Sequence, residues 1–443
     1  MNLPIRQTVT GRIAKNNLIY AAYCAATTCA VPLVTVGLLA SARGRRRLGE
    51  RFGSWKPVGE VDWWLHGASV GEVQGLLPFI RQIRGERSSD RVLLTATSPT
   101  GLERGSGAVD QARLLPLDTP VLTKRSLAQV HASRFVLSET ELWPALISGV
   151  LRQGVPCHII NGRISDYTLK TYRTFNGLFA PLLNNFCSIS VPDEEQRQRF
   201  LSLGIDPELL HVIGHTKYDS SPRLSGEDFR SRAREKFFPG IKNETPIIVL
   251  GSLRNGEEQV WFPALKSAWD SGLKFKVIIA PRHAERFDYF WSETASLGRS
   301  AARWSSGIGT ELGDYDVLLL DTFGVLEEAY AGGDLAFVGA TLVDIGGHNP
   351  FEPAMYRVPV VVGPYSSVIR EPVSLMRERG GIIEVQDSSE LLALLKRVCA
   401  GDPELHRVGQ AGYAVFASQR GASGRALEAI RHSEALAWEG NAD

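Results

Sequence analysis

The sequence predicts an α/β protein with two doubly wound parallel sheets, one in each half of the chain, preceded by an apolar segment. Short, non-alternating runs of β-branched residues recur along both halves, as expected of strands buried on both faces of a parallel sheet. Polar or amphipathic stretches of helical length separate most of these runs. This alternation is typical of strand–helix–strand units.

Twelve such runs are too many for one compact sheet at these spacings, so we predict two Rossmann-like domains. The predicted parts are a membrane-anchor segment at residues 1–42, a first domain at 43–222 and a second domain at 223–443. The polar interval from Ser220 to Asn243 is the predicted hinge. The predicted strands are VDWWLH (61–66), RVLLTAT (91–97), ARLLPL (112–117), RFVLS (134–138), PCHII (156–160), CSISV (187–191), TPIIVLG (245–251), FKVIIAP (275–281), YDVLLLD (315–321), LAFVG (335–339), VPVVVGP (358–364) and GIIEV (381–385).

The N-terminal segment is apolar enough to insert into a membrane or bind its surface. Residues 16–41 carry no charge, and a helix that spans a bilayer needs about 20 residues. Pro32, Gly37 and three threonines make a poor spanning helix, so an interfacial anchor, a secretory signal and a buried core helix stay open as alternatives. The basic residues that follow favour keeping the later domains in the cytoplasm, and we predict a tethered cytoplasmic enzyme. These residues are Arg43, Arg45, Arg46, Arg47 and Arg51.

Charge and cysteine content exclude several classes of protein. The 443 residues hold 49 Lys and Arg against 48 Asp and Glu, a net charge of +1, which argues against a nucleic-acid binder. The five cysteines are odd in number and lack paired spacing, so neither a disulfide framework nor a zinc site is expected. HExxH and CxxC are absent as well, and we expect no metal ligands.

Polar residues directly after the predicted strands are the candidate site residues, because open α/β sheets bind ligands at the carboxyl ends of their strands. In the first half, WLHGASVGEV (64–73) places Glu72 at the start of a helix. Glu72 is either a general base or a first-turn acid that complements the helix dipole. SETELWP (138–144) offers Glu139 and Glu141 for a hydroxyl-rich substrate, or as residues that begin a helix.

NGRIS (161–165) follows the next strand and offers Arg163 and Ser165 as polar contacts. The alternative is an ordinary helix start with Ser165 or Asp166 as its N-cap.

The second half contains residues that predict an anion-binding site. PRHAERF (281–287) places Arg282 at a strand end, and DTFGVLEEAY (321–330) places small residues at another. In DIGGHNPFEPAMY (344–356), two glycines precede Asn349 as an N-cap and Pro350 at the first helical position. Such a helix start presents free N–H groups to a phosphate, and Glu352 in its first turn can accept hydrogen bonds from hydroxyl groups.

Several nucleotide-enzyme motifs are missing. Neither half has GxGxxG after its first strand, and GxxxxGK[ST] does not occur, which argues against a dinucleotide oxidoreductase and a P-loop NTPase. Two α/β domains with a phosphate seat in the second instead indicate an enzyme that uses a nucleotide sugar.

The motifs together resemble a known family. WLHGASVGEV, SETELWP, NGRIS, VIGHTKYD (212–219), APRHAERF, DTFG and GGHNPFEPA occur in this order. This ordered set resembles the 3-deoxy-D-manno-octulosonic acid (Kdo) transferases of lipopolysaccharide synthesis, from about residue 32 to about residue 381.

The resemblance implies a GT-B fold, with an N-terminal acceptor domain and a C-terminal donor domain facing a cleft. It implies inverting transfer of Kdo from CMP-Kdo to a lipid A precursor (lipid IVA), with no metal or cofactor, at the cytoplasmic face of the inner membrane. By resemblance Glu72 is the catalytic base, and Glu139, Arg163 and Ser165 lie on the acceptor side. The implied donor contacts are Pro281, Arg282, Phe323, Gly324, Val325, Asn349, Pro350, Phe351 and Glu352.

The chain departs from the family pattern at one position of the donor side. The family commonly reads DTMGEL where this chain reads DTFGVL, so Val325 replaces a carboxylate. Glu327 and Glu328 are the candidates to compensate for it. Another GT-B nucleotide-sugar transferase or epimerase, and a non-catalytic membrane-tethered binding module, are the alternatives to a Kdo transferase.

Overall fold

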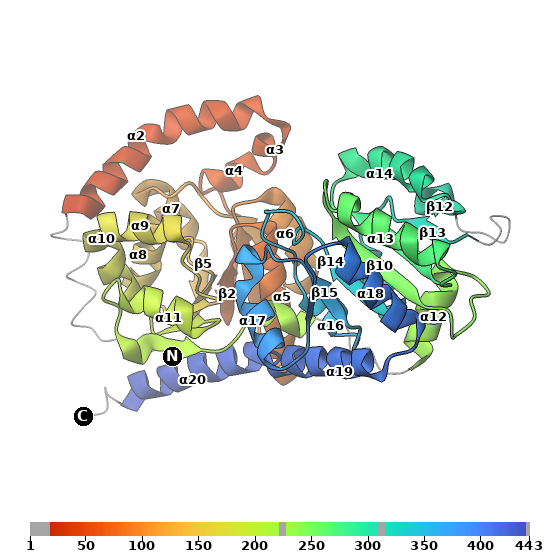
Figure 1. Cartoon of the computed structure of the whole chain (residues 1–443). Coiled ribbons are helices and arrows are strands. Elements are labelled where there is room, and N and C mark those ends of the chain that lie inside the picture. Colours follow the sequence, from red (N-terminus) through yellow and green to blue (C-terminus); the bar gives the residue numbers. More distant parts are fainter. Residues whose placement is uncertain (1–17, 221–226, 308–314, 440–443) are drawn as a thin grey trace. The chain divides into compact units, whose positions relative to one another are not determined.

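The computed structural model describes residues 18–220, 227–307 and 315–439, and it divides the chain into two compact units (Figure 1). Unit 1 comprises Met1–Ser221 together with Gln419–Asp443, and unit 2 comprises Pro222–Ser418. The prediction placed residues 223–443 in one domain, whereas the structure returns the last segment of the chain to unit 1. Helix α20 (Ala422–Glu439) lies there against α5 (Val70–Glu86) and β8 (Ser188–Val191).

Unit 1 is built on a parallel seven-stranded sheet in the order β4-β3-β2-β6-β7-β8-β9, and β1 and β5 form a separate parallel pair. Its strands are β1 (Gly59–Val61), β2 (Trp63–His66), β3 (Val92–Ala96), β4 (Gln111–Leu114), β5 (Val130–Ala132), β6 (Phe135–Ser138), β7 (Cys157–Ile160), β8 and β9 (Leu210–Val212). Its other helices are α2 (Leu18–Ala40), α3 (Ala42–Arg45), α4 (Leu48–Arg51), α6 (Pro99–Gly105), α7 (Pro120–Leu127), α8 (Pro144–Arg152), α9 (Asp166–Thr174), α10 (Asn176–Leu183) and α11 (Glu194–Leu201).

Unit 2 repeats this plan with a parallel seven-stranded sheet in the order β12-β13-β11-β10-β14-β15-β16. Its strands are β10 (Ile247–Leu253), β11 (Lys276–Pro281), β12 (Ala301–Arg303), β13 (Val317–Leu319), β14 (Leu335–Val338), β15 (Val360–Val362) and β16 (Ile383–Glu384). Its helices are α12 (Glu227–Phe237), α13 (Glu258–Asp270), α14 (Phe287–Thr294), α15 (Leu326–Gly332), α16 (Phe351–Ala354), α17 (Arg370–Glu378), α18 (Ser388–Cys399) and α19 (Pro403–Ser418).

Both sheets are buried on both faces, as their continuous apolar runs predict. In β2, Trp64 belongs to one core cluster, while its neighbours Trp63 and Leu65 belong to another. In β10 the same alternation separates Ile248 from Val249. Successive side chains of a strand point to opposite faces, so each unit has two cores with the sheet between them.

The predicted α/β architecture is confirmed, and all twelve predicted runs contain strands. The four strands that the sequence did not predict are β1, β5, β9 and β12, which lie in the small pair or at the sheet edges. The predicted hinge also contains α12, whose Ala233 and Phe237 are buried and which contacts α15. The sequence analysis did not predict this helix, because most of its residues are charged or polar.

Among the described residues, α2 is the one helix that is long and apolar enough to cross a membrane, judged by length and composition. It has 23 residues and includes Pro32.

Candidate active site

Glu72 lies in the first turn of α5, directly after β2. The Ser69 hydroxyl caps this helix by accepting a hydrogen bond from the Glu72 N–H at 3.2 Å. In return, Oε2 of Glu72 accepts a hydrogen bond from the Ala68 N–H at 2.7 Å, which resembles a capping box. Within the described chain Oε1 accepts no hydrogen bond, so one carboxylate oxygen is fixed and the other stays available.

Two further carboxylates lie close enough to Glu72 to interact with its charge. Burial raises the pKa of Glu139, and the charge of Glu72 raises it further against the opposing effects of Arg163 and Lys217. The pKa of Glu141 is raised by burial, then by Glu72 and Glu139. Glu139 also has φ of 61°, a left-handed conformation that costs about 1 kcal/mol or more for a residue with a side chain. The three acids form a cluster at the carboxyl edge of the first sheet, and Glu139 alone among them has a strained backbone.

Thr216 connects the motifs that surround this cluster. Its hydroxyl donates to the Gly75 carbonyl of α5 at 2.6 Å and accepts from the Asn161 side-chain amide at 2.7 Å. Oδ1 of Asn161 accepts from the Thr216 N–H at 3.1 Å. This fully buried network ties VIGHTKYD and NGRIS to the helix that carries Glu72.

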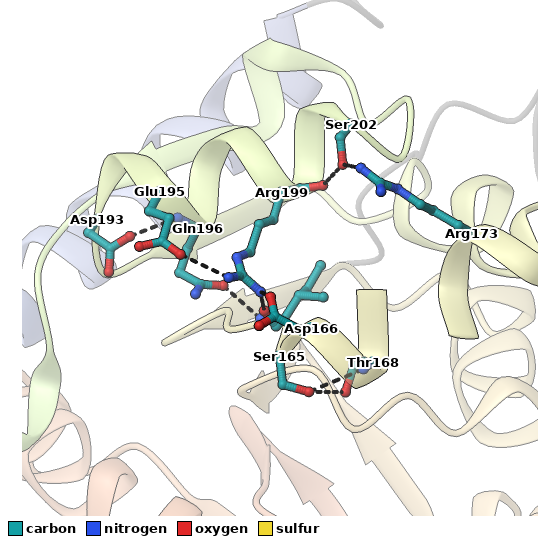
Figure 2. A network of polar contacts seen from close by, with 10 residues as sticks. Ser165, Asp166, Thr168, Arg173, Asp193, Glu195, Gln196, Arg199 and Ser202 are labelled. Carbon is teal, nitrogen blue, oxygen red and sulfur yellow. Dashed lines mark hydrogen bonds and ion pairs between the residues drawn. The ribbon is translucent and has the colours of Figure 1, made fainter. Parts of the chain in front are cut away.

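The two predicted site residues of the NGRIS loop differ in their surroundings. Arg163 is exposed and is close enough to Glu139 to affect its pKa. Ser165 is the N-cap of α9 and accepts a hydrogen bond from the Thr168 N–H at 3.1 Å. Figure 2 shows how Arg199 of α11 then holds this helix start, through ion pairs with Asp166 at 2.7 Å and Glu195 at 2.8 Å. The N-cap alternative therefore accounts for Ser165.

In unit 2, a buried carboxylate organises the loops that follow β10 and β14. Glu257 is fully buried, and its carboxylate accepts hydrogen bonds from the N–H groups of Arg254 at 2.8 Å and of three successive residues at 3.0 Å. These three residues are Ala340, Thr341 and Leu342. Glu257 thereby fixes the backbone of Arg254, and with it the starting point of the Arg254 side chain.

Cationic side chains gather at this edge of the second sheet. The Arg254 guanidinium contacts Nε2 of His283. Burial lowers the pKa of His348 to about 4, and the charges of Arg282, Arg254 and His283 contribute to this shift. His348 is therefore neutral near pH 7. Arg282 is exposed and forms no ion pair in the described part of the chain, so its charge is available to an anion.

The loop after β13 holds the three predicted donor contacts Phe323, Gly324 and Val325. Phe323 is 60% exposed, its ring centroid lies 5.6 Å from that of Phe287, and Gly324 has φ of 90°. Val325 is half-buried and packs against an apolar cluster.

Both candidates to compensate for Val325 have partners within unit 2. Glu327 accepts a hydrogen bond from the Tyr356 hydroxyl at 3.1 Å, and Glu328 pairs with Lys236.

The Asn349–Glu352 segment differs in part from its prediction. Oδ1 of Asn349 accepts a hydrogen bond from the Phe351 N–H at 3.1 Å, as a cap does, but α16 has only four residues and its dipole is small. Phe351 packs near Phe416 with 2% exposure. The side chains of Pro281, Pro350 and Phe351 are buried, whereas Glu352 is exposed. The Phe351 N–H already donates to Asn349, and a proline has no N–H to offer.

Sequence reasoning missed three residues of these edges: Arg254, Lys217 and Thr216. Arg254 lies in SLRNGEE directly after a predicted strand, and its position at a strand end was a usable signal. Lys217 and Thr216 belong to VIGHTKYD, where only contact with Glu139 and Asn161 in the folded unit reveals their roles.

Comparison with known proteins identifies the family of the chain. A family model described as 3-deoxy-D-manno-octulosonic-acid transferase (kdotransferase) matches residues 46–220. The 3-deoxy-D-manno-octulosonic acid transferase of Haemophilus influenzae is 30% identical over 414 residues, which cover 90% of this chain and 94% of that protein. The enzyme of the same name from Chlamydia pneumoniae is 32% identical over 350 residues, 76% of this chain and 77% of that protein.

Among solved structures, the UDP-GlcNAc 2-epimerase of Neisseria meningitidis bound to UDP-GlcNAc shares the fold. It has a TM-score of 0.58 and 14% identity, and the match covers 85% of this chain and 100% of that chain. Similarity at this level concerns the fold alone and agrees with the GT-B architecture. On the strength of the sequence relatives, the chain belongs to the Kdo transferase family and is a glycosyltransferase.

Proposed function

We propose that this protein transfers Kdo from CMP-Kdo to a hydroxyl group of a lipid A precursor, with inversion at the anomeric carbon. The observation that carries the proposal is Glu72, whose carboxylate has one fixed oxygen and one free oxygen at the carboxyl edge of the first sheet. The relatives named as Kdo transferases support the choice of sugar.

In the proposed reaction, Oε1 of Glu72 removes the proton of the acceptor hydroxyl while that oxygen attacks the anomeric carbon of Kdo. A bond forms between the acceptor oxygen and this carbon, and the bond from the carbon to the phosphate oxygen breaks. CMP leaves with the electron pair, and this single displacement inverts the anomeric configuration. A positioned general base contributes typically 10²–10⁴-fold to such a step.

On the donor side, Arg282 and Arg254 offset the negative charge that grows on the CMP phosphate as it leaves. Backbone N–H groups of the glycine-rich loop before Asn349 complete the proposed donor seat, and Pro281, Pro350 and Phe351 shape the backbone beside it. Phe323, Gly324, Val325 and Glu352 lie at the same edge as further contacts. On the acceptor side, Glu139 and Arg163 bind polar groups of the lipid, and the Ser165 hydroxyl assists them while it caps α9.

The proposed acceptor is a membrane lipid, which places the enzyme at the inner membrane with its catalytic units on the cytoplasmic side. Support comes from α2 and from the arginines that follow it. No metal or other cofactor is part of the proposed mechanism, because guanidinium groups take the role of neutralising the leaving phosphate.

A transfer assay tests the proposal. The detergent-solubilised protein is incubated with CMP-Kdo and a tetraacylated lipid A precursor, and the lipid is followed by mass spectrometry. We expect a mass gain of one or more Kdo units together with released CMP. A modified nucleotide sugar without a lipid product would instead indicate an epimerase, and an inert but folded protein would indicate a binding module.

A further inference from the structure

The first turns of α2 are docked onto the folded part of unit 1. Tyr20 is buried with 7% exposure, and a Cβ atom placed on Gly177 of α10 would lie only 3.1 Å from Cδ1 of Ile19. The Tyr23 hydroxyl donates a hydrogen bond of 2.7 Å to Oδ2 of Asp118. The N-terminal end of this apolar helix is therefore attached to α10 and to the loop before α7.

Asp118 is itself rigidly held. Its side chain is 6% exposed, and its two oxygens accept hydrogen bonds from the N–H groups of Ala145 at 2.9 Å and Leu146 at 2.8 Å. These groups begin α8, which directly follows the segment that carries Glu139. Tyr23 thus binds a fixed acceptor within the catalytic unit.

The other end of α2 also returns to unit 1. After Ala40 the chain continues through the short helices α3 and α4, as Figure 1 shows in red at the top of the view. Oε2 of Glu50 then accepts a hydrogen bond from the Leu114 N–H at 2.6 Å, and the Arg51 guanidinium donates to the Thr97 carbonyl at 3.1 Å.

A membrane-crossing helix cannot satisfy both sets of contacts. At 1.5 Å per residue, a helix of this length measures about 34 Å, close to the roughly 30 Å thickness of the hydrocarbon core. A crossing would put Tyr23 in the far half of that core and Arg51 outside its near side, whereas both bind the same folded unit. We propose that α2 lies in the plane of the membrane interface, with unit 1 against one of its faces and lipid against the other. This proposal deepens, and rests on, the proposed association with the membrane.

The outward face of α2 fits an anionic lipid surface. Leu33, Val36 and Leu39 are 78%, 66% and 47% exposed, an apolar face suited to the boundary of headgroups and acyl chains. Arg43 and Arg45 follow directly, are exposed, and form no ion pair within the described residues, although Arg45 donates a hydrogen bond to the Leu39 carbonyl at 2.8 Å. Arg46 and Arg47, in contrast, pair with Glu103 and Glu50. The adjacent apolar face and unpaired guanidinium groups match lipids with acidic headgroups.

Site-directed spin labelling distinguishes the two orientations without any use of enzyme activity. Single cysteines at positions 18, 29 and 39 are placed in an otherwise cysteine-free full-length chain and labelled with a nitroxide in phosphatidylethanolamine–phosphatidylglycerol vesicles. An interfacial helix gives similar, shallow depths at all three positions by oxygen and nickel-chelate accessibility. A maximum of depth at position 29, with both ends at the surface, would overturn the proposal. A protein that does not sediment with the vesicles would refute the membrane association itself.

Removal of Arg43 and Arg45 tests whether these residues bind acidic headgroups. The double variant Arg43→Gln/Arg45→Gln is expected to bind these vesicles about thirtyfold more weakly, about fivefold for each charge near the surface. The control variant Arg379→Gln/Arg407→Gln removes two exposed guanidinium groups of unit 2 and should bind as the parent does. Equal losses in both double variants would show that net charge, and not this face, drives binding.

Discussion

Arg254 shows how one buried acid positions a cation at the carboxyl edge of the second sheet. Glu257 accepts the Arg254 N–H and also holds the loop after β14, so the guanidinium stands on a backbone fixed from two strands. The contact with His283 then orients the side chain beside the β11 loop that carries Arg282. Arg254 therefore adds positive charge beside His283 and His348 at this edge of the second sheet.

Arg254→Gln is therefore expected to weaken binding of CMP-Kdo by about tenfold to a hundredfold. This change in Kd corresponds to the free energy of one hydrogen bond to a charged group. Isothermal titration with CMP measures this effect apart from catalysis. Arg379→Gln, which removes an exposed cation of the same unit, is the control and should bind CMP normally. Unchanged affinity in Arg254→Gln would remove this residue from the donor seat.

At the residue scale, the sequence predicts which segments lie at the carboxyl edges of the sheets. It predicts less well which side chains of those segments are exposed to a ligand. Glu72, Arg282 and Asn349 all follow strands and lie at the expected edges. Phe351 lies in the same segment as Asn349 but faces the core, because the turn of a four-residue helix directs it toward Phe416. The partners of Glu327 and Glu328 come from other elements, and no local pattern shows them.

At the element scale, α20 is held to unit 1 by a partly buried ion pair. Arg134 donates to the two oxygens of Glu434 at 2.9 and 3.2 Å, and Nε2 of His158 lies 3.5 Å away. Burial opposes ionisation of Glu434, but the hydrogen bonds from His158 and Arg134 outweigh it and lower its pKa from 4.5 to about 2. This carboxylate stabilises the fold above pH 4.5, and its contribution disappears as the pH falls toward 2.

Glu434→Gln should accordingly lower the free energy of unfolding by about 2 kcal/mol at neutral pH, because Arg134 loses its partner. The loss should shrink as the pH falls from 4.5 toward 2, where the parent protein also loses the charge. Thermal unfolding as a function of pH measures both effects. Glu428→Gln, at an exposed position of the same helix, should stay within about 0.5 kcal/mol of the parent.

The junction of β10 and β14 depends on a residue without a side chain. A Cβ atom on Gly339 would lie 2.2 Å from the carbonyl oxygen of Ser252, which is backbone and cannot move aside. Gly339→Ala should therefore destabilise unit 2 by about 2 kcal/mol and weaken CMP binding. Gly85→Ala is the matched control, since its Cβ would meet nothing within 4 Å near the end of α5. It should stabilise the protein by up to about 1 kcal/mol. Similar losses in both variants would contradict the steric argument.

The strands that the sequence predicted and those it missed differ in burial. The predicted runs include all the central strands, whose side chains are buried on both faces, and also the edge strands β4 and β16. The two other edge strands, β9 and β12, have three residues each and are partly exposed, so they lack the continuous apolar run on which the prediction depends. Short edge strands without such a run escape this kind of analysis.

At the scale of the whole molecule, the chain leaves unit 1 after residue 221 and returns to it at residue 419. Asp219, at the end of the first passage, accepts hydrogen bonds from the N–H groups of Gly421 at 2.6 Å and Ser423 at 2.7 Å. The sequence prediction counted α20 with the second domain, because an amphipathic helix does not show in its own residues which sheet it will cover.

The proposed reaction uses guanidinium groups instead of a metal, and this choice makes a prediction for the whole enzyme. Transfer of Kdo should continue at an unchanged rate after dialysis against EDTA and in its presence. Loss of activity that Mg²⁺ or Mn²⁺ restores would contradict the proposed mechanism.

The most direct test of the central claim compares the parent enzyme with Glu72→Gln in one assay, under single-turnover conditions with CMP-Kdo and a lipid A precursor. We predict that the parent adds Kdo to the lipid, and that the variant is at least about a hundredfold slower, since it lacks its general base. The variant should still bind CMP with the parent affinity and unfold at the parent temperature. If Glu72→Gln transfers Kdo at the parent rate, or loses CMP binding together with transfer, Glu72 is not the catalytic base.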